Sequence, residues 1–232
     1  MKKDIYAVFG TGGFAREVMP LVDEYLSTLS PESYEMIFVT DVKIEEGLEK
    51  INGVQLVSFD ELCKMPSGKK YITIALADSL TRRDIAKKVS QAGMEFFSVK
   101  AFNSVKLSEV QLNEGAILCS FVTLTSNIKI GKFFHANLYS YVGHDCVIGD
   151  FVTFAPSVKC NGNVVIEDDV YVGTGAIIKE GKKGRPIVIG KGAKIAAGSF
   201  VTKSVPPGLT VIGNPAVPLG RDSLRKGKYR CV

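Results

Sequence analysis

The sequence predicts two parts, a small Rossmann-like α/β domain followed by a left-handed parallel β-helix. The first part is indicated by a strand, a glycine turn and a helix that open the chain between Ile5 and Leu29. The second is indicated by apolar residues that recur every six positions from Lys106 onward. A length of 232 residues, 46% of them hydrophobic, suffices for two small domains. We therefore expect an α/β domain in residues 1–103, the β-helix in residues 104–220 and a basic tail in residues 221–232.

The glycine turn has the spacing of a turn that binds a phosphate or a sugar. Gly10, Gly12 and Ala15 fit the pattern G-x-G-x-x-A, between the apolar run Ile5–Phe9 and a helical stretch from Arg16. Glycines let the backbone approach a phosphate closely, and the helix N-terminus offers free N–H donors. A tight turn without a ligand is the alternative interpretation.

Further strand patterns place more candidate residues at the same edge of the sheet. The run at residues 36–39 leads into Asp41, and the run at residues 71–76 leads into Ala77. Other strands are expected at residues 54–57 and 95–99, and helices near residues 59–62 and 80–92. The ligand edge would then carry Gly12, Gly13, Asp41 and Ala77. No oxidoreductase substrate domain follows, so a nucleotide or nucleotide-sugar fits this edge better than a nicotinamide dinucleotide.

The six-residue repeat predicts short strands joined by corners. The first and fifth positions of each block are apolar or small, and the first positions are Leu112, Leu118, Leu124, Ile130, Ala136, Val142, Ile148, Phe154, Cys160, Ile166, Val172 and Ile178. Two inward positions per block and three blocks per coil describe a parallel β-helix, and known hexapeptide-repeat coils are left-handed. Five extra residues, Lys182–Pro186, interrupt the repeat. Such a β-helix is a prism with flat faces, and three prisms packed side by side cover one another's faces. A homotrimer is therefore expected.

His144 is the candidate catalytic residue within the repeat. It occupies the third, outward position of its block, and with eighteen residues per coil it stacks between Ser126 and Gly162. Gly162 would leave room for a ligand and offer its backbone N–H to an oxyanion. A neutral imidazole can serve as a general base near neutral pH. A surface histidine without a role is the alternative.

Asp145 is the expected partner of this base. The same stacking places Asp145 between Asn127 and Asn163, whose side chains would hold its carboxylate. The carboxylate would fix the tautomer of His144 and raise its basicity.

The remaining histidine and two of the cysteines are assigned no chemistry. His135 falls on another face of the coil and is expected at the surface or in a trimer contact, whereas Cys146 and Cys160 fall on inward positions. Two histidines cannot provide the three ligands of a carbonic-anhydrase-type zinc site, so no metal is expected.

Composition argues against several classes of function. A net charge of +5 is too mild to indicate nucleic-acid binding. No stretch approaches the roughly 20 apolar residues of a membrane span, and the first apolar run is too short for a signal peptide. Five cysteines without a CxxC pair favour a reduced, cytoplasmic protein.

Three segments, Phe9–Gly13, Val142–Asp150 and Val211–Ala216, resemble a known family. They are similar to the left-handed β-helix acetyltransferases that make N-acetylated 4-amino sugars on nucleotide carriers, such as the bacillosamine-pathway and perosamine N-acetyltransferases, with sialic acid O-acetyltransferases as cousins. The resemblance implies a trimer that takes acetyl-CoA as co-substrate, in the groove between neighbouring β-helices, and a nucleotide-linked amino-sugar on the N-terminal domain.

The resemblance also implies roles for individual residues. His144 would be the base, Asp145 would support it, and Asn137 would contact the sugar. The nucleotide positions are matched by Gly13, Phe14, Ala15, Asp41 and Ala77, and the coenzyme positions by Thr153, Thr174 and Ala197. Some relatives carry histidine at the position of Thr153 and an acid at the position of Thr40, and glycine is usual at Ala77 and Ala197. These departures do not affect the base, but they leave open which nucleotide is bound and which residue contacts the acyl group.

The interruption of the repeat carries its own hypothesis. Lys182, Lys183 and Arg185 would pair with the 3′-phosphoadenosine part of CoA, and a solvated loop is the alternative. The favoured function is N-acetyl transfer by direct attack of the amine on the thioester. O-acetylation of a sugar hydroxyl and a non-catalytic nucleotide-sugar-binding scaffold remain alternatives.

Overall fold

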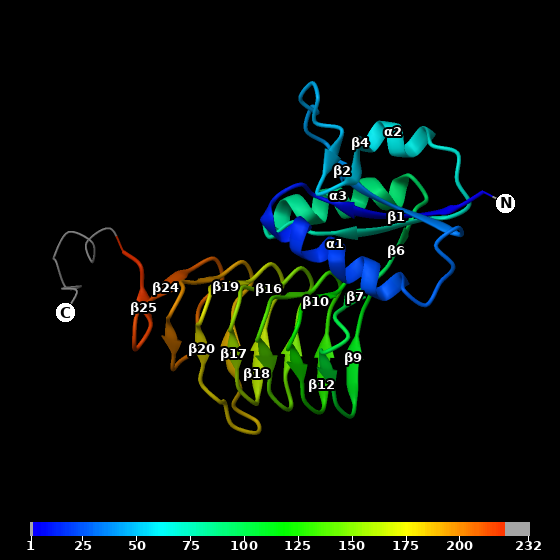
Figure 1. Ribbon diagram of the computed structural model, residues 1–232. Helices are drawn as coiled ribbons and strands as arrows, with labels where there is room; N and C mark the ends of the chain where they lie inside the picture. The colour runs from blue at the N-terminus through cyan, green and yellow to red at the C-terminus, as the bar shows by residue number, and fades with distance from the viewer. Residues whose placement is uncertain (1, 221–232) are drawn as a thin grey trace.

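The computed structural model describes residues 2–220, and the predicted basic tail lies outside them. A six-stranded sheet with three helices is followed by a stack of coils, and Figure 1 shows the sheet domain above the first coils while the C-terminal strands lie at the other end of the stack. The arrangement agrees with the two parts expected, although the exact division at residues 103 and 104 stays a prediction.

The N-terminal sheet is parallel except at one edge. Its strand order is β3-β4-β2-β1-β5-β6, and only β3 runs antiparallel to its neighbour β4. The strands are β1 (Asp4–Phe9), β2 (Tyr34–Thr40), β3 (Lys50–Ile51), β4 (Val54–Ser58), β5 (Lys70–Ile74) and β6 (Glu95–Phe96). The helices are α1 (Gly13–Leu26), α2 (Phe59–Lys64) and α3 (Ser79–Gln91). The antiparallel hairpin of β3 and β4 had no counterpart in the predicted pattern.

The glycine turn lies between β1 and α1, at the carboxyl edge of the sheet. Gly10 has a φ of 125°, and a Cβ there would lie 3.0 Å from the Ala75 carbonyl oxygen, so only glycine fits this turn. Gly12 is the N-cap of α1 in an extended conformation and makes no side-chain cap. The first helical N–H groups of α1 are therefore directed to this edge.

The strands of the coils form three sheets, which are parallel except that β25 runs antiparallel to β24. The first has the order β25-β24-β22-β19-β16-β13-β10-β7, the second β23-β20-β17-β14-β11-β8, and the third β21-β18-β15-β12-β9. The strands are β7 (Val99–Lys100), β8 (Val105–Lys106), β9 (Val110–Leu112), β10 (Ile117–Leu118), β11 (Thr123–Leu124), β12 (Ile128–Ile130), β13 (His135–Ala136), β14 (Tyr141–Val142), β15 (Val147–Ile148), β16 (Thr153–Phe154), β17 (Lys159–Cys160), β18 (Val164–Ile166), β19 (Tyr171–Val172), β20 (Ile177–Ile178), β21 (Ile187–Ile189), β22 (Lys194–Ile195), β23 (Phe200–Val201), β24 (Thr210–Ile212) and β25 (Val217–Pro218).

Strand pairing confirms the coil length. Ile117 pairs with His135, His135 with Thr153, and Thr153 with Tyr171, each eighteen residues further on. Tyr171 then pairs with Lys194, which lies five residues beyond that spacing because the insertion falls in this coil. One strand prediction was wrong, because the run expected at residues 95–99 divides into β6 of the first sheet and β7 of the coils. Phe97 and Ser98 separate the two strands, and neither glycine nor proline marks the break in the sequence.

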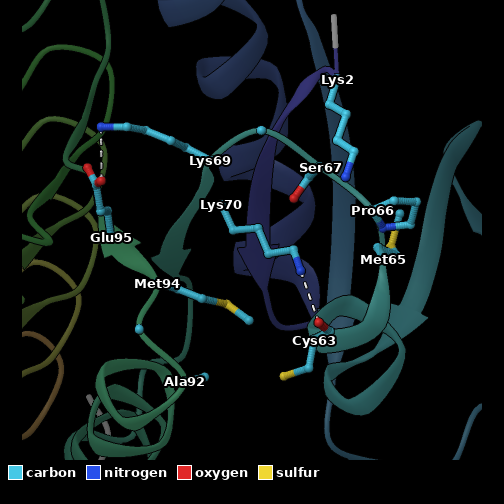
Figure 2. A pocket seen from close by; sticks show the side chains of 12 residues that line it. Lys2, Cys63, Met65, Pro66, Ser67, Lys69, Lys70, Ala92, Met94 and Glu95 are labelled. Atoms are coloured by element: carbon cyan, nitrogen blue, oxygen red, sulfur yellow. Dashed lines mark hydrogen bonds and ion pairs between the residues drawn. The ribbon is translucent and has the colours of Figure 1, made fainter.

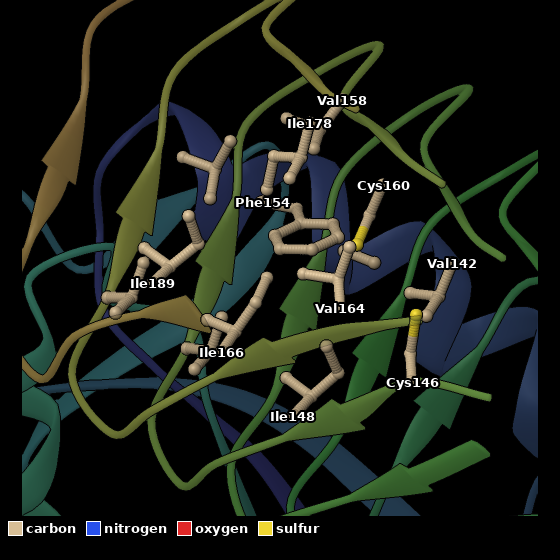
Figure 3. Packing of buried hydrophobic residues seen from close by; sticks show 14 of the residues in the cluster. Val142, Cys146, Ile148, Phe154, Val158, Cys160, Val164, Ile166, Ile178 and Ile189 are labelled. Carbon is tan, nitrogen blue, oxygen red and sulfur yellow. The ribbon is translucent and has the colours of Figure 1, made fainter. Parts of the chain in front are cut away.

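The inward positions of the blocks form one continuous core. Val142, Cys146 and Cys160 are fully buried in it, as expected from the repeat frame, and Figure 3 shows them packed with Phe154 and Ile166. Burial of such a column of side chains is the main stabilising contribution of a β-helix. The repeat frame read from the sequence therefore predicts which residues point into the core.

From residue 109 to residue 175, the corners use a left-handed backbone conformation at the fourth block position. Positive φ recurs there at Glu109, Phe121, Asn127, Phe133, Tyr139, Asp145, Phe151, Ser157, Asn163 and Asp169, with Gly115 and Gly175 completing the series. This conformation costs a non-glycine residue about 1 kcal/mol or more, and asparagine and aspartate tolerate it best. Asp145 donates its backbone N–H to the Ser126 carbonyl one coil earlier, and this hydrogen bond is repeated along the stack.

Candidate active site

His144 and Asp145 form a hydrogen-bonded pair on the corner between β14 and β15. Nδ1 of His144 lies 2.8 Å from Oδ2 of Asp145, and about half of each side chain is exposed. The hydrogen bond to Asp145 raises the pKa of His144, and Glu180 adds a smaller electrostatic contribution in the same direction. An imidazole with Nδ1 engaged by a carboxylate presents Nε2 for proton transfer.

The backbone around the pair is fixed by the neighbouring coils. Asp145 N–H donates to Ser126, and Asn163 N–H donates to the His144 carbonyl. The predicted role of the asparagines is wrong, because among residues 2–220 neither Asn127 nor Asn163 makes a side-chain hydrogen bond to Asp145. The Asp145 carboxylate is hydrogen-bonded to His144 instead.

Gly162 lies beside the imidazole, as the eighteen-residue spacing predicts. A Cβ on Gly162 would come within 2.6 Å of Cε1 and Nε2 of His144. Its carbonyl accepts a hydrogen bond from Gly181, whereas its N–H has no partner in the described part of the chain. The absence of a side chain at Gly162 therefore makes room for the His144 imidazole, and the Gly162 N–H is left as a free backbone donor beside it.

A third side chain, that of Glu180, lies next to the His144–Asp145 pair and was not predicted from the sequence. Glu180 places Oε1 3.6 Å from Nε2 of His144. Glu180 is thirty-six residues after His144 and therefore occupies the same block position two coils further on. Applying the coil spacing twice to His144 would have found it.

A cavity of about 150 Å³ gathers other predicted site residues between the N-terminal domain and the coils. It is lined from the sheet side by Phe14 and Ala77 and from the coils by Asn137, Thr153 and Thr174. They include residues that were predicted to contact the nucleotide, the sugar and the coenzyme. Neither His144 nor Asp145 lines this cavity, because β14 separates their corner from the corner of Asn137.

The other predicted binding residues lie on several parts of the molecule. Gly12 and Gly13 are exposed at the start of α1, Ala15 is buried in the first turn of that helix, and Asp41 is paired with Lys88 at 2.7 Å. Ala197 is exposed near the C-terminal coils, and Lys182, Lys183 and Arg185 lie on an exposed hairpin closed by hydrogen bonds between residues 182 and 185. The pairing of this hairpin with the coenzyme stays a prediction.

A buried arginine links the N-terminal domain to the coils beside the cavity. Arg82 of α3 is fully buried and donates through Nη1 to the Leu76 carbonyl at 2.6 Å and through Nη2 to the Phe151 carbonyl at 2.6 Å. Nη2 also donates to Oγ1 of Thr153 at 3.0 Å. Burial lowers the pKa of Arg82 to about 9, an effect that the charge of Asp169 opposes. The guanidinium thus fixes the end of β5 against β16.

His135 is part of this buried cluster, so its predicted surface position was wrong. It is 1% exposed, and its Nδ1 lies 3.1 Å from Nη1 of Arg82. Because arginine can only donate, Nδ1 accepts and the ring is neutral. Burial and the nearby Arg82 charge hold the pKa of His135 well below its usual range. The position does point out of the coil, but the N-terminal domain covers it.

A larger cavity of about 460 Å³ lies at the opposite edge of the N-terminal sheet. Figure 2 shows Lys2, Lys70 and Glu95 around it, and Lys70 donates to the Cys63 carbonyl. These residues lie at or near the amino ends of β1, β5 and β6. Ligands of parallel α/β sheets bind at the carboxyl ends of the strands, so this cavity is not the candidate site.

Neither a metal cluster nor a membrane span is found among residues 2–220. No group of three or more His, Cys, Asp or Glu side chains is arranged to hold a metal ion in this range. Likewise, no helix there is long and apolar enough to cross a membrane.

Comparison with known proteins identifies the family. No family model matches the chain. GDP-perosamine N-acetyltransferase from Escherichia coli O157:H7 is 44% identical over 218 residues, which make up 94% of this chain and 97% of that protein. The chain belongs to the amino-sugar N-acetyltransferase family.

Solved structures of similar proteins agree with this assignment. WeeI from Acinetobacter baumannii AYE is 49% identical, with a TM-score of 0.87 and coverage of 94% of this chain and 100% of that one. PerB from Caulobacter crescentus, solved with CoA and GDP-perosamine, is 22% identical with a TM-score of 0.78, covers 93% of this chain and 97% of its own, and supports the fold alone. This amino-sugar N-acetyltransferase family member therefore has the left-handed β-helix fold of its structural neighbours.

Proposed function

We propose that this protein transfers the acetyl group of acetyl-CoA to the amino group of a GDP-linked 4-amino sugar, with GDP-perosamine as the first acceptor to test. The Escherichia coli relative is named for this reaction, and PerB was solved with CoA and GDP-perosamine. The observation in this chain that carries the proposal is the His144–Asp145 pair, with a hydrogen bond of 2.8 Å at Nδ1 and Nε2 left for the acceptor.

The pair supports a direct acyl transfer. The amine nitrogen attacks the thioester carbonyl carbon while Nε2 of His144 accepts a proton, and the carboxylate of Asp145 stabilises the imidazolium that forms. The free N–H of Gly162 is the candidate donor to the oxyanion of the tetrahedral intermediate. The C–S bond then breaks, and the proton passes to the sulfur of CoA.

Two chains would complete one site. The cavity with Asn137 and the corner with His144 are separated by β14 within one chain, so a neighbouring copy in a homotrimer would bring its His144 to this cavity. Asn137 would hold the sugar and Thr153 and Thr174 would lie along the coenzyme. The Rossmann-like N-terminal domain would bind the nucleotide at Gly12, Gly13 and its neighbours. A cytoplasmic location suits an enzyme that consumes acetyl-CoA and nucleotide-sugars.

The test is thiol release from acetyl-CoA across GDP-, UDP- and dTDP-linked 4-amino sugars, with mass spectrometry of the products. We expect the GDP-linked amino sugar to give the highest kcat/KM and a product heavier by one acetyl group. Preference for UDP- or dTDP-linked sugars would contradict the assigned nucleotide. Acetylation of a matched hydroxyl sugar in preference to the amine would support O-acetyl transfer instead.

A further inference from the structure

His144, Gly162 and Glu180 occupy the third position of equivalent blocks in three successive coils, on one corner. They are eighteen residues apart, and successive coils of a parallel sheet are spaced about 4.8 Å. The backbones of His144 and Glu180 are therefore about 10 Å apart, and their side chains bridge this distance because Gly162 between them has none. Oε1 of Glu180 reaches 3.6 Å from Nε2 of His144.

The backbone that carries Glu180 is held in register. Gly181 N–H donates to the Gly162 carbonyl at 2.9 Å, and Asn163 N–H donates to the His144 carbonyl at 2.9 Å. A Cβ on Gly181 would collide with the Asn163 carbonyl oxygen, so this approach of the coils also depends on glycine. The Glu180 carboxylate accordingly lies near Nε2, the imidazole nitrogen that Asp145 does not engage.

The distance to Nε2 leaves this carboxylate available to a ligand. A charge-assisted hydrogen bond between nitrogen and oxygen is about 2.7–2.9 Å long, and the contact of 3.6 Å exceeds this range. Both side chains are about half exposed, at 52% for His144 and 56% for Glu180. A positively charged nitrogen beside Nε2 would therefore meet two acceptors, the imidazole and the carboxylate.

An amino sugar supplies such a nitrogen. An alkylamine is largely an ammonium ion near neutral pH, whereas the corresponding hydroxyl is neutral. Hydrogen bonds to charged groups contribute more than those between neutral groups. A carboxylate at this point therefore attracts the amine acceptor and does little for a hydroxyl acceptor.

We propose that Glu180 is a specificity-determining residue that holds the ammonium form of the acceptor beside Nε2 of His144, and thereby favours N-acetylation over O-acetylation. The inference rests on the proposed function. The ammonium loses one proton to bulk water, and the neutral nitrogen then attacks the thioester carbonyl carbon. His144 accepts a second proton, which passes to the sulfur of CoA as the C–S bond breaks.

The test compares Glu180→Gln with the wild type. The substitution keeps the shape of the side chain and removes its charge. We expect KM for the amino sugar to rise about tenfold, which corresponds to the loss of one charged hydrogen bond. KM for acetyl-CoA should stay within about twofold. Glu32→Gln, which changes an exposed carboxylate in the turn before β2, is the matched control and should behave as the wild type.

A binding measurement separates this inference from the proposed function. Calorimetry without acetyl-CoA would compare the GDP-linked amino sugar with the same nucleotide-sugar carrying a hydroxyl at that position. Glu180→Gln should weaken binding of the amine about tenfold and leave binding of the hydroxyl analogue unchanged. Equal weakening of both ligands, or no change for the amine, would overturn the role of Glu180. If the wild type binds the amine but releases no thiol, the proposed function fails and the binding comparison still decides on Glu180.

Discussion

The imidazole of His144 lies between two carboxylates that come from different coils. Asp145 is its sequence neighbour, whereas Glu180 reaches it across Gly162. Because an amine must lose a proton during acetyl transfer, a base stabilised in its protonated form is suited to this step. The pKa of His144 is raised first by the hydrogen bond to Asp145 and then by charges that include Glu180.

The first prediction concerns the pH dependence set by Asp145. Only the neutral imidazole can accept a proton, so kcat/KM should rise with pH along a limb centred above the ordinary histidine value of about 6.5. Asp145→Asn removes the group that raises the pKa of His144, so the limb should move to lower pH while its plateau falls. The measurement is kcat/KM for the amino sugar from pH 5 to 9. A limb that does not move would show that Asp145 does not control the base.

At the scale of residues, the repeat frame predicts well which side chains point into the coil and which point out of it. It predicts less well what the outward side chains contact. It placed Cys146 and Cys160 in the core, His144 outside and Gly162 beside it. It could not place His135 correctly, because an outward position on a coil is exposed only where nothing packs on it. A contact between domains has no local sequence signal.

At the scale of elements, α3 joins the two parts of the molecule. Its Arg82 donates to the carbonyl of Leu76 at the end of β5 and to the carbonyl of Phe151 before β16. Arg83 adds an ion pair of 2.9 Å with Asp169 of the coils. The loop that carries Ala77 is thereby fixed relative to the strand that carries Thr153, and both residues line the same cavity.

The second prediction follows from this connection. Arg82→Met leaves the buried carbonyls of Leu76 and Phe151 without a donor, and each such loss costs about 1–3 kcal/mol. We expect the free energy of unfolding to fall by about 2–5 kcal/mol in urea denaturation. Lys87→Met on the same helix is the control, since Lys87 makes only an exposed ion pair with Asp84 and should change nothing measurable. Equal stability of the two variants would contradict the role assigned to Arg82.

Elements inside the repeat followed directly from the sequence, whereas elements at its borders did not. The positions of β9 to β20 follow from the six-residue period, and the insertion was visible as a break in it. The boundary between β6 and β7 was hidden, because only two residues separate the strands and neither is glycine or proline. The left-handed corners carry mixed residues, including Phe133 and Tyr139, so composition alone does not mark them.

At the scale of the whole molecule, the candidate site is divided between two places on the chain. The cavity with Asn137 lies between the N-terminal domain and the first sheet of the coils, and the base lies on the corner beyond β14. Closed symmetry with heterologous contacts allows one copy to face the cavity of the next. The central claim is therefore that His144 of one chain acts at the cavity of another.

Thiol release by mixed assemblies tests this claim most directly. His144→Ala and Asn137→Ala chains, carrying different tags, would be co-expressed and the mixed assemblies purified through both tags. Each variant alone should lose most of its activity, by about 10²-fold or more for His144→Ala. Each mixed trimer should regain about a third of the wild-type sites, because only one of its three interfaces brings an intact His144 to a chain with an intact Asn137. An inactive mixture, or a His144→Ala variant that keeps most of its kcat, would contradict the account.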